Sequence, residues 1–130
     1  MIDFLHLYCF MYITLFLHEF GHAFMCFIFK KNIKHIKIGD IVILKISKYK
    51  LGLLPLNGYV AFSYYELKKH QQLCIYLIGP IITFILLIVF INEEFIKYNN
   101  IIILQLVSQL FLSFFGDNSD IKNALNNKTN

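Results

Sequence analysis

The sequence contains no arginine and no tryptophan, and none of its three cysteines belongs to a CxxC pair. All twelve basic residues are lysine. Because these lysines are spread among isoleucines and do not form one basic face, the composition argues against nucleic-acid binding. Cys9, Cys26 and Cys74 lie in apolar stretches. Neither a disulfide framework nor a thiolate zinc site is therefore indicated, and we expect the cysteines to pack as small apolar side chains.

Charge is also scarce along much of the chain. Its 130 residues, enough for one domain, are 58% hydrophobic with a mean hydropathy of +0.61, which is far too apolar for an ordinary soluble domain. Residues 4–29, 73–91 and 101–115 are nearly free of charge. At about 1.5 Å per residue the first two can cross a hydrocarbon core of about 30 Å, whereas the third covers about 22 Å. The sequence therefore predicts an α-helical polytopic membrane protein with about three transmembrane helices, at about residues 4–29, 73–91 and 101–116.

The charged residues predict the orientation of the chain in the membrane. Nine of the twelve lysines lie between the first and second apolar stretches. By the positive-inside rule this segment is cytoplasmic, and the loop that contains Glu93 and Glu94 lies outside. The first stretch lacks the basic region and the small-residue cleavage site of a signal peptide, so we expect it to remain in the protein. These features predict a multi-pass integral membrane protein of the cell membrane, in contact with the lipid bilayer.

The rest of the chain is expected to differ from the apolar helices. A Gly-Asp pair at residues 39–40 stands between β-branched runs and fits a tight hairpin turn, and we expect a β-hairpin-containing segment at about residues 31–62. Pro80 should kink or interrupt the second helix, because proline lacks a backbone donor. Residues 1–120 are expected to form a single domain, followed by a frayed polar tail at 121–130.

Residues 18–22, HEFGH, match the HExxH pattern. In a helix, residues i and i+4 share a face, so the imidazoles of His18 and His22 can point at one metal ion. Ionisable residues at the centre of a membrane helix cost about 2.5–3.5 kcal/mol each and are rarely present without a partner or a task. We therefore favour a metal site over the alternative that these side chains only satisfy one another inside a helix bundle.

A catalytic zinc ion ordinarily has three protein ligands and an open position for water, so two imidazoles leave one ligand to be found. Glu19 is adjacent to His18 in sequence, which aims it beside the metal as a general base for the water. On helix rise, His18 and His22 lie about 21 and 27 Å along the first helix. Asp117 and Asp120 lie about 24 and 28 Å along the third. Both aspartates reach the depth of the metal, so helix geometry does not choose between them.

The arrangement of these residues resembles the site-2 protease family of intramembrane zinc metalloproteases. The matching pieces follow the family's order along most of the chain. They are residues 18–22 for the HExxH zinc motif, residues 55–60 for its PxGGYV loop, Gly79-Pro80 for its GPxxN element and residues 115–120 for its NxxPxxxxDG region.

The resemblance implies that Asp120 is the third zinc ligand. It also implies a substrate contact at Thr83, which stands where the family has an asparagine thought to hold the substrate or its oxyanion. The chain departs from the last family motif, because Leu112, Phe115 and Ile121 replace its asparagine, proline and glycine.

Asn57 is a further candidate for substrate binding. Exposed strand edges can bind an extended peptide by β-augmentation, and the segment around Asn57 can line the path of such a peptide. A structural turn is the alternative for this residue.

The sequence thus predicts an intramembrane zinc metalloendopeptidase that hydrolyses a peptide bond in or near the membrane. One zinc ion would activate water, with Glu19 as general base, and the substrate would be a single-pass membrane protein or peptide. One alternative is a weakly active or inactive relative that binds membrane peptides without cutting them. Another is a small metal-handling membrane transporter. The sequence does not predict the oligomeric state.

Overall fold

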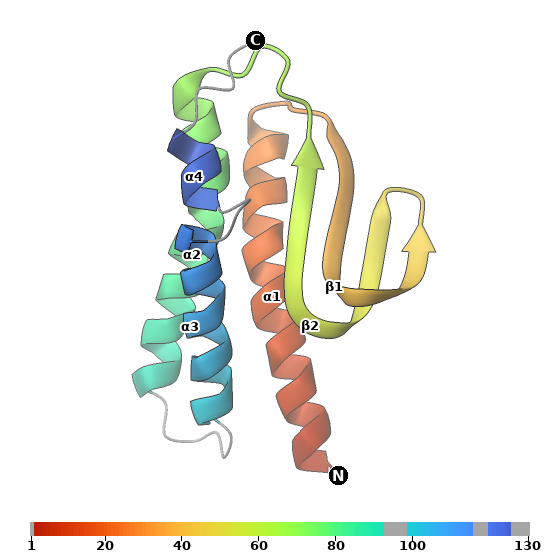
Figure 1. The fold of residues 1–130 in the computed structure, drawn as a ribbon, viewed down its shortest axis with the longest axis vertical. Helices are drawn as coiled ribbons and strands as arrows, with labels where there is room; N and C mark the ends of the chain where they lie inside the picture. The colour runs from red at the N-terminus through yellow and green to blue at the C-terminus, as the bar shows by residue number, and fades with distance from the viewer. Residues whose placement is uncertain (1, 93–98, 116–119, 126–130) are drawn as a thin grey trace.

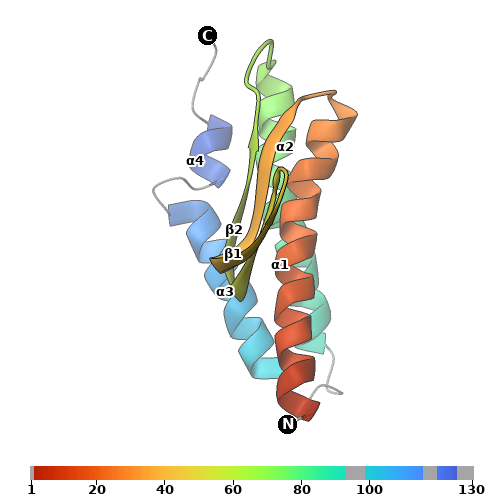
Figure 2. The same ribbon diagram turned by 90° about the vertical axis from the view of Figure 1, so that its right-hand side faces the viewer.

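The computed structural model describes residues 2–92, 99–115 and 120–125. Figure 1 shows three long helices side by side, with a two-stranded hairpin against the first of them. The hairpin packs mainly on that first helix, and Figure 2 shows it in front of the bundle, between the first and third helices. The elements are, in order, α1 (Ile2–Ile28), β1 (Ile33–Ile46), β2 (Tyr49–Phe62), α2 (Lys69–Asn92), α3 (Asn99–Phe115) and α4 (Asp120–Leu125).

Three helical stretches are long and apolar enough to cross a membrane, namely Asp3–Ile28, Lys69–Ile91 and Asn100–Leu125. An antiparallel sheet of two strands lies between the first and the second. The expected pattern of helices and hairpin is therefore confirmed, although α2 begins at Lys69 and not at residue 73.

Pro80 does not interrupt α2, so of the two outcomes predicted for it, a kink or an interruption, the interruption is wrong. Neighbouring helices and threonine side chains can support a helix through a proline at membrane depth. Here α2 packs against both α1 and α3, and Thr83 Oγ1 donates to the carbonyl oxygen of Gly79 at 3.1 Å. Packing on both sides is consistent with a helix that continues through the proline.

The predicted hairpin turn at residues 39–40 is wrong, because the turn connecting β1 and β2 lies at Ser47 and Lys48. Gly39 instead sits inside β1 with a φ of 85°, at a register irregularity. A Cβ atom there would lie 2.8 Å from Tyr12 Oη on α1 and 2.9 Å from the Leu54 carbonyl oxygen. The glycine therefore lets the ribbon bend close to α1, and residues 36–38 pair with both 58–60 and 49–51.

The interior consists of two apolar clusters and a set of buried polar side chains. The first cluster contains Cys26, Phe62, Leu67, Ile75, Tyr76 and Ala124. The second contains Phe90, Ile102 and Leu106. The buried polar side chains, which we call the polar interior, are Thr14, His18, Glu19, His22, Gln72, Thr83, Gln105, Gln109 and Ser113. Cys26 packs as an apolar side chain, as expected, whereas Cys9 and Cys74 are exposed, so the prediction of packing is wrong for these two.

The segment after Asp120 is not the frayed tail that the sequence suggested, as far as residue 125. Asp120–Leu125 forms α4, which packs against α2 and buries Ala124. Lys69 Nζ donates to the Leu125 carbonyl oxygen at 2.7 Å, and Gln72 Nε2 donates to the Asn123 carbonyl oxygen. These bonds to two C-terminal carbonyls hold the short helix in place. Residues 126–130 lie outside the described part of the chain.

Candidate metal centre

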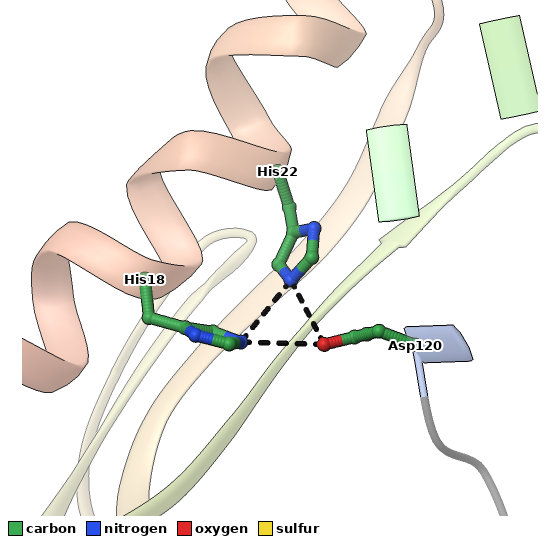
Figure 3. Close-up of side chains that lie close together, drawn as sticks. All are labelled: His18, His22 and Asp120. Atoms are coloured by element: carbon green, nitrogen blue, oxygen red, sulfur yellow. Dashed lines mark hydrogen bonds and ion pairs between the residues drawn. The ribbon is translucent and has the colours of Figure 1, made fainter. Parts of the chain in front are cut away.

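Three side chains converge between α1 and α4 (Figure 3). His18 Nε2 lies 3.3 Å from His22 Nε2 and 3.3 Å from Asp120 Oδ2. His22 Nε2 lies 3.4 Å from the same carboxylate oxygen. Ligand atoms about 2.0–2.1 Å from zinc at tetrahedral angles are about 3.3 Å apart. The triangle of donor atoms therefore has the size that a tetrahedral zinc site requires.

Hydrogen bonds behind the imidazoles fix which ring nitrogen faces the centre. His22 Nδ1 lies 2.6 Å from the Ile75 carbonyl oxygen, which only accepts, so Nδ1 carries the proton. His18 Nδ1 lies 2.6 Å from Thr83 Oγ1, whose own proton goes to the Gly79 carbonyl oxygen. His18 therefore also donates from Nδ1. Both Nε2 lone pairs are left pointing at the centre, as metal-binding histidines require.

Thr83 is the residue for which the resemblance implied a contact with the substrate. Its side chain is fully buried, and it is absent from the residues that line the cavity described below. Its hydroxyl is used by His18 and by the Gly79 carbonyl oxygen. The substrate contact expected of Thr83 stays a prediction, and the contact that the structure shows is one that orients the His18 ring.

Two glycines let the backbone come close to the functional side chains. A Cβ atom on Gly79 would lie 2.8 Å from His18 Nε2 and even closer to His22 Nε2. A Cβ atom on Gly58 would lie 2.7 Å from Glu19 Oε1. Both separations are below any normal Cβ contact. Glycine at these positions follows from close approach of α2 and β2 to α1.

Glu19 lies beside the three donors and is not one of the group that could hold a metal ion. Its side chain is buried at 4% exposure and lines the same cavity. Its role as a general base stays a prediction. Of the two aspartates considered, Asp120 reaches the histidines, whereas Asp117 lies outside the described residues.

A cavity of about 650 Å³ opens next to the three donors. Its walls come from α1, from residues 56–62 of β2, from Tyr64, from Tyr76 of α2, and from α3 and α4. Asn57 is one of these wall residues, and its Oδ1 accepts a hydrogen bond from the Gly58 amide at 2.9 Å. The cavity is large enough for an extended peptide segment beside the donors.

The apolar stretch that forms α3 also contains a regular pattern of polar residues. Gln105, Gln109 and Ser113 recur every four residues in the apolar stretch that became α3, so they share one helix face. All three are buried, and the last two line the cavity. Ser113 Oγ lies 3.4 Å from Asp120 Oδ2. A polar stripe within a candidate membrane helix points to a functional interior face.

Comparison with known protein families matches residues 6–116 to peptidase family M50. The match contains the HExxH residues, the hairpin, α2 and α3, and it ends before Asp120. Comparison with curated proteins gave no match.

Proposed function

Because the chain belongs to peptidase family M50, the site-2 protease family of membrane metalloproteases, we propose that it is an intramembrane zinc endopeptidase of the cell membrane. Its substrate is a single-pass membrane protein or a membrane peptide. One observation carries the proposal: three donor atoms have tetrahedral zinc spacing, with Glu19 beside them in a cavity.

In this proposal His18, His22 and Asp120 hold one zinc ion. The ion supplies a Lewis acid that polarises a peptide carbonyl and activates water. Glu19 takes a proton from the water and later gives it to the leaving amine nitrogen, so that cleavage ends with a free amine and a carboxylate. Its burial among α1 and β2 keeps its carboxylate fixed beside the reacting group.

The hairpin offers a way to bind the substrate. Residues 56–62 line the cavity, and within the described sheet β2 has one strand neighbour, β1. Residues 58–60 of β2 pair with residues 36–38 of β1, and within the described sheet no strand pairs with the other edge of this segment. An extended peptide would add there as a further strand. We propose that Asn57, at this edge, contacts that peptide.

The test is a comparison of wild type with Glu19→Gln, each measured for bound zinc and for cleavage of a model transmembrane peptide. We expect Glu19→Gln to keep zinc and to lose cleavage by about 10²–10⁴-fold, the usual contribution of a general acid–base group. Glu66→Gln is the matched control, because Glu66 is an exposed glutamate outside the site. Equal cleavage by wild type and Glu19→Gln refutes the mechanism. Bound zinc without cleavage by wild type favours a peptide-binding relative, and metal flux in liposomes favours a transporter.

A further inference from the structure

Two glutamines one turn apart on α3 are both buried, but their amide groups have opposite surroundings. Gln105 Nε2 donates to the carbonyl oxygens of Met11 at 3.0 Å and Pro55 at 2.9 Å. Its Oε1 accepts from Thr14 Oγ1 at 3.3 Å. Gln109 Nε2 and Oε1 are also buried, yet neither has a hydrogen-bond partner among the described residues. Gln105 thus links α1, β2 and α3, whereas the Gln109 side-chain amide makes no hydrogen bond among the described residues.

An amide without partners is costly to bury, because it has two donor hydrogens and an accepting oxygen that lose their contact with water. Buried polar groups in folded proteins are therefore nearly always hydrogen-bonded, and an exception needs an explanation. Gln109 is 6% exposed and lines the cavity that also contains His18, Glu19 and Asp120. The explanation that fits this position is a partner that arrives through the cavity.

Other polar side chains on the cavity wall already have partners. Asn57 Oδ1 accepts from the Gly58 amide, and the hydroxyls of Tyr64 and Tyr76 are hydrogen-bonded to each other. Ser113 Oγ donates to the Gln109 carbonyl oxygen at 2.9 Å. Gln109 therefore differs from these neighbours in having a complete amide free to bind a ligand.

We propose that Gln109 binds the main chain of the substrate peptide. Its Nε2 donates to a peptide carbonyl oxygen, and its Oε1 accepts from a peptide N–H, so that the side-chain amide pairs with the N–H and C=O of one residue of an extended peptide. This inference rests on the proposed function and extends it, because it names the group that holds the peptide from the side of α3. Hydrogen bonds to main-chain atoms do not distinguish one peptide sequence from another. Gln109 therefore contributes affinity for extended peptides of many sequences.

The experiment measures peptide affinity and cleavage separately, in the full chain. A fluorescent transmembrane peptide is titrated into Glu19→Gln protein, with and without Gln109→Leu, and the same peptide is given to proteins with the natural Glu19. Gln109→Met is a second variant of similar size. We expect both substitutions to keep zinc and to leave the unfolding temperature equal or higher, because they remove an unpaired buried amide. We expect the affinity and kcat/KM to fall about tenfold.

Ester substitution in the peptide tests direct contact. If Gln109 only supported the fold, its substitution would not change how the affinity depends on single peptide N–H groups. Replacing single peptide N–H groups by ester oxygens, apart from the cleaved bond, should lower the affinity of Glu19→Gln protein wherever the N–H is bonded, and one of these positions should be the one that Gln109 contacts. At that position Gln109→Leu protein should bind the ester and the amide equally. Gln105→Leu is the matched control: it should lower the unfolding temperature, because it removes the hydrogen bonds from the Gln105 amide to the Met11 and Pro55 carbonyl oxygens, but keep the ester sensitivity.

The outcomes separate this inference from the proposed function. If Gln109 variants bind and cut the peptide like wild type, or show the same ester sensitivity, the role of Gln109 is refuted while the protease stands. If the peptide binds in a Gln109-dependent way and no protein cuts it, the inference stands and the protease proposal fails. If the Glu19→Gln protein binds no peptide, the inference is refuted.

Discussion

The polar interior and the distal half of the hairpin, residues 41–54, have opposite compositions. Nine polar side chains are buried between the helices. The distal hairpin instead exposes large apolar side chains, with Ile41 and Ile43 at 62% and Ile46 at 61%. Soluble proteins show the reverse preference, since isoleucine is among their most buried residues and charged side chains among their least. This contrast is typical of membrane proteins, whose outer surface contacts apolar surroundings and whose buried polar groups serve a function.

The two regions also differ in how their side chains are held. In the polar interior, hydrogen bonds link α1 to α2 through His18 and Thr83, and α1 to α3 through Thr14 and Gln105. The distal hairpin is held by its strand pairing, and its side chains lie mostly on the surface. Exposed apolar patches of this kind are typical of surfaces that meet a membrane or another protein. Substitutions should therefore disturb metal binding strongly in the first region and weakly in the second.

The largest effect is expected from the histidines. His18→Ala or His22→Ala removes one of three ligands and leaves the triangle open, so bound zinc and cleavage should both be lost. Zinc is measured by metal analysis of the purified protein, before and after treatment with a chelator. His6→Ala is the control, because His6 lies exposed on the same helix. Zinc bound at wild-type levels in either alanine variant would contradict the proposed ligand set.

The next effect separates the two aspartates. Asp120→Asn removes the negative charge that lies 3.3 and 3.4 Å from the imidazoles, and it should lose most of the bound zinc. Asp117→Asn should keep it. The measurement is zinc content of the two variants side by side. Loss in the Asp117 variant alone would reverse the assignment, and retention in both would mean that neither aspartate is a required ligand.

The two glycines should separate metal binding from catalysis. Gly79→Ala pushes a methyl group against both imidazoles and should weaken zinc binding. Gly58→Ala pushes against Glu19 and should keep zinc while lowering cleavage by about 10²-fold, the effect of misplacing a reacting group by about 1 Å. Zinc affinity and kcat are measured for both. Gly21→Ala is the control, because its methyl group would meet the movable end of Ile82. Equal zinc affinity in all three variants would show that the structure relaxes around the methyl group of Gly79→Ala.

A smaller effect is expected at Thr83. Thr83→Val keeps the shape but removes the acceptor for His18 Nδ1, and loss of such a partner typically weakens metal binding by about 10–100-fold. Thr83→Ser should restore the affinity, because it restores the hydroxyl. Zinc titration of the three proteins checks this. A Val variant with wild-type zinc affinity would show that the His18 ring does not need its hydrogen bond to Thr83.

The smallest effect on the site is expected in the distal hairpin. Lys45→Cys should leave zinc content unchanged, and the new thiol should react with a membrane-impermeant reagent from the cytoplasmic side. A cysteine at position 94, which lies outside the described residues, should react from the other side. Lys45→Cys in a background without the native cysteines is the appropriate protein, because Cys9 and Cys74 are exposed. Labelling from the opposite sides would overturn the orientation, and loss of zinc would show that the two regions are coupled.

Features that depend on neighbours in sequence were predictable. The spacing of His18 and His22 is a property of one helix, and their predicted convergence agrees with the 3.3 Å between their Nε2 atoms. Asp120 required two inputs, helix depth and motif order, because 98 positions separate it from His22. The helices followed from apolar length, although Pro80 suggested a kink or an interruption and the helix continues through it.

Features that depend on distant partners were not predictable. Gly39 has the conformation of a turn residue, but its use as a bend depends on Tyr12 of α1. Thr83 was assigned to the substrate from the family resemblance, and nothing in the sequence shows that its hydroxyl meets His18, 65 positions away. The stripe containing Gln109 was visible, but the lack of a partner for its amide emerges only when α1, β2 and α3 are assembled.

The distance along the chain between the ligands sets the order of events during synthesis. His18 and His22 emerge first, and α2 and α3 must follow before Asp120 completes the set. Until then the nascent chain has two imidazoles and Glu19 in the membrane but lacks the third donor. Metal binding is coupled to assembly when ligands come from separate segments. In a metal site built this way, the full set of three donors exists only after the last described helix docks.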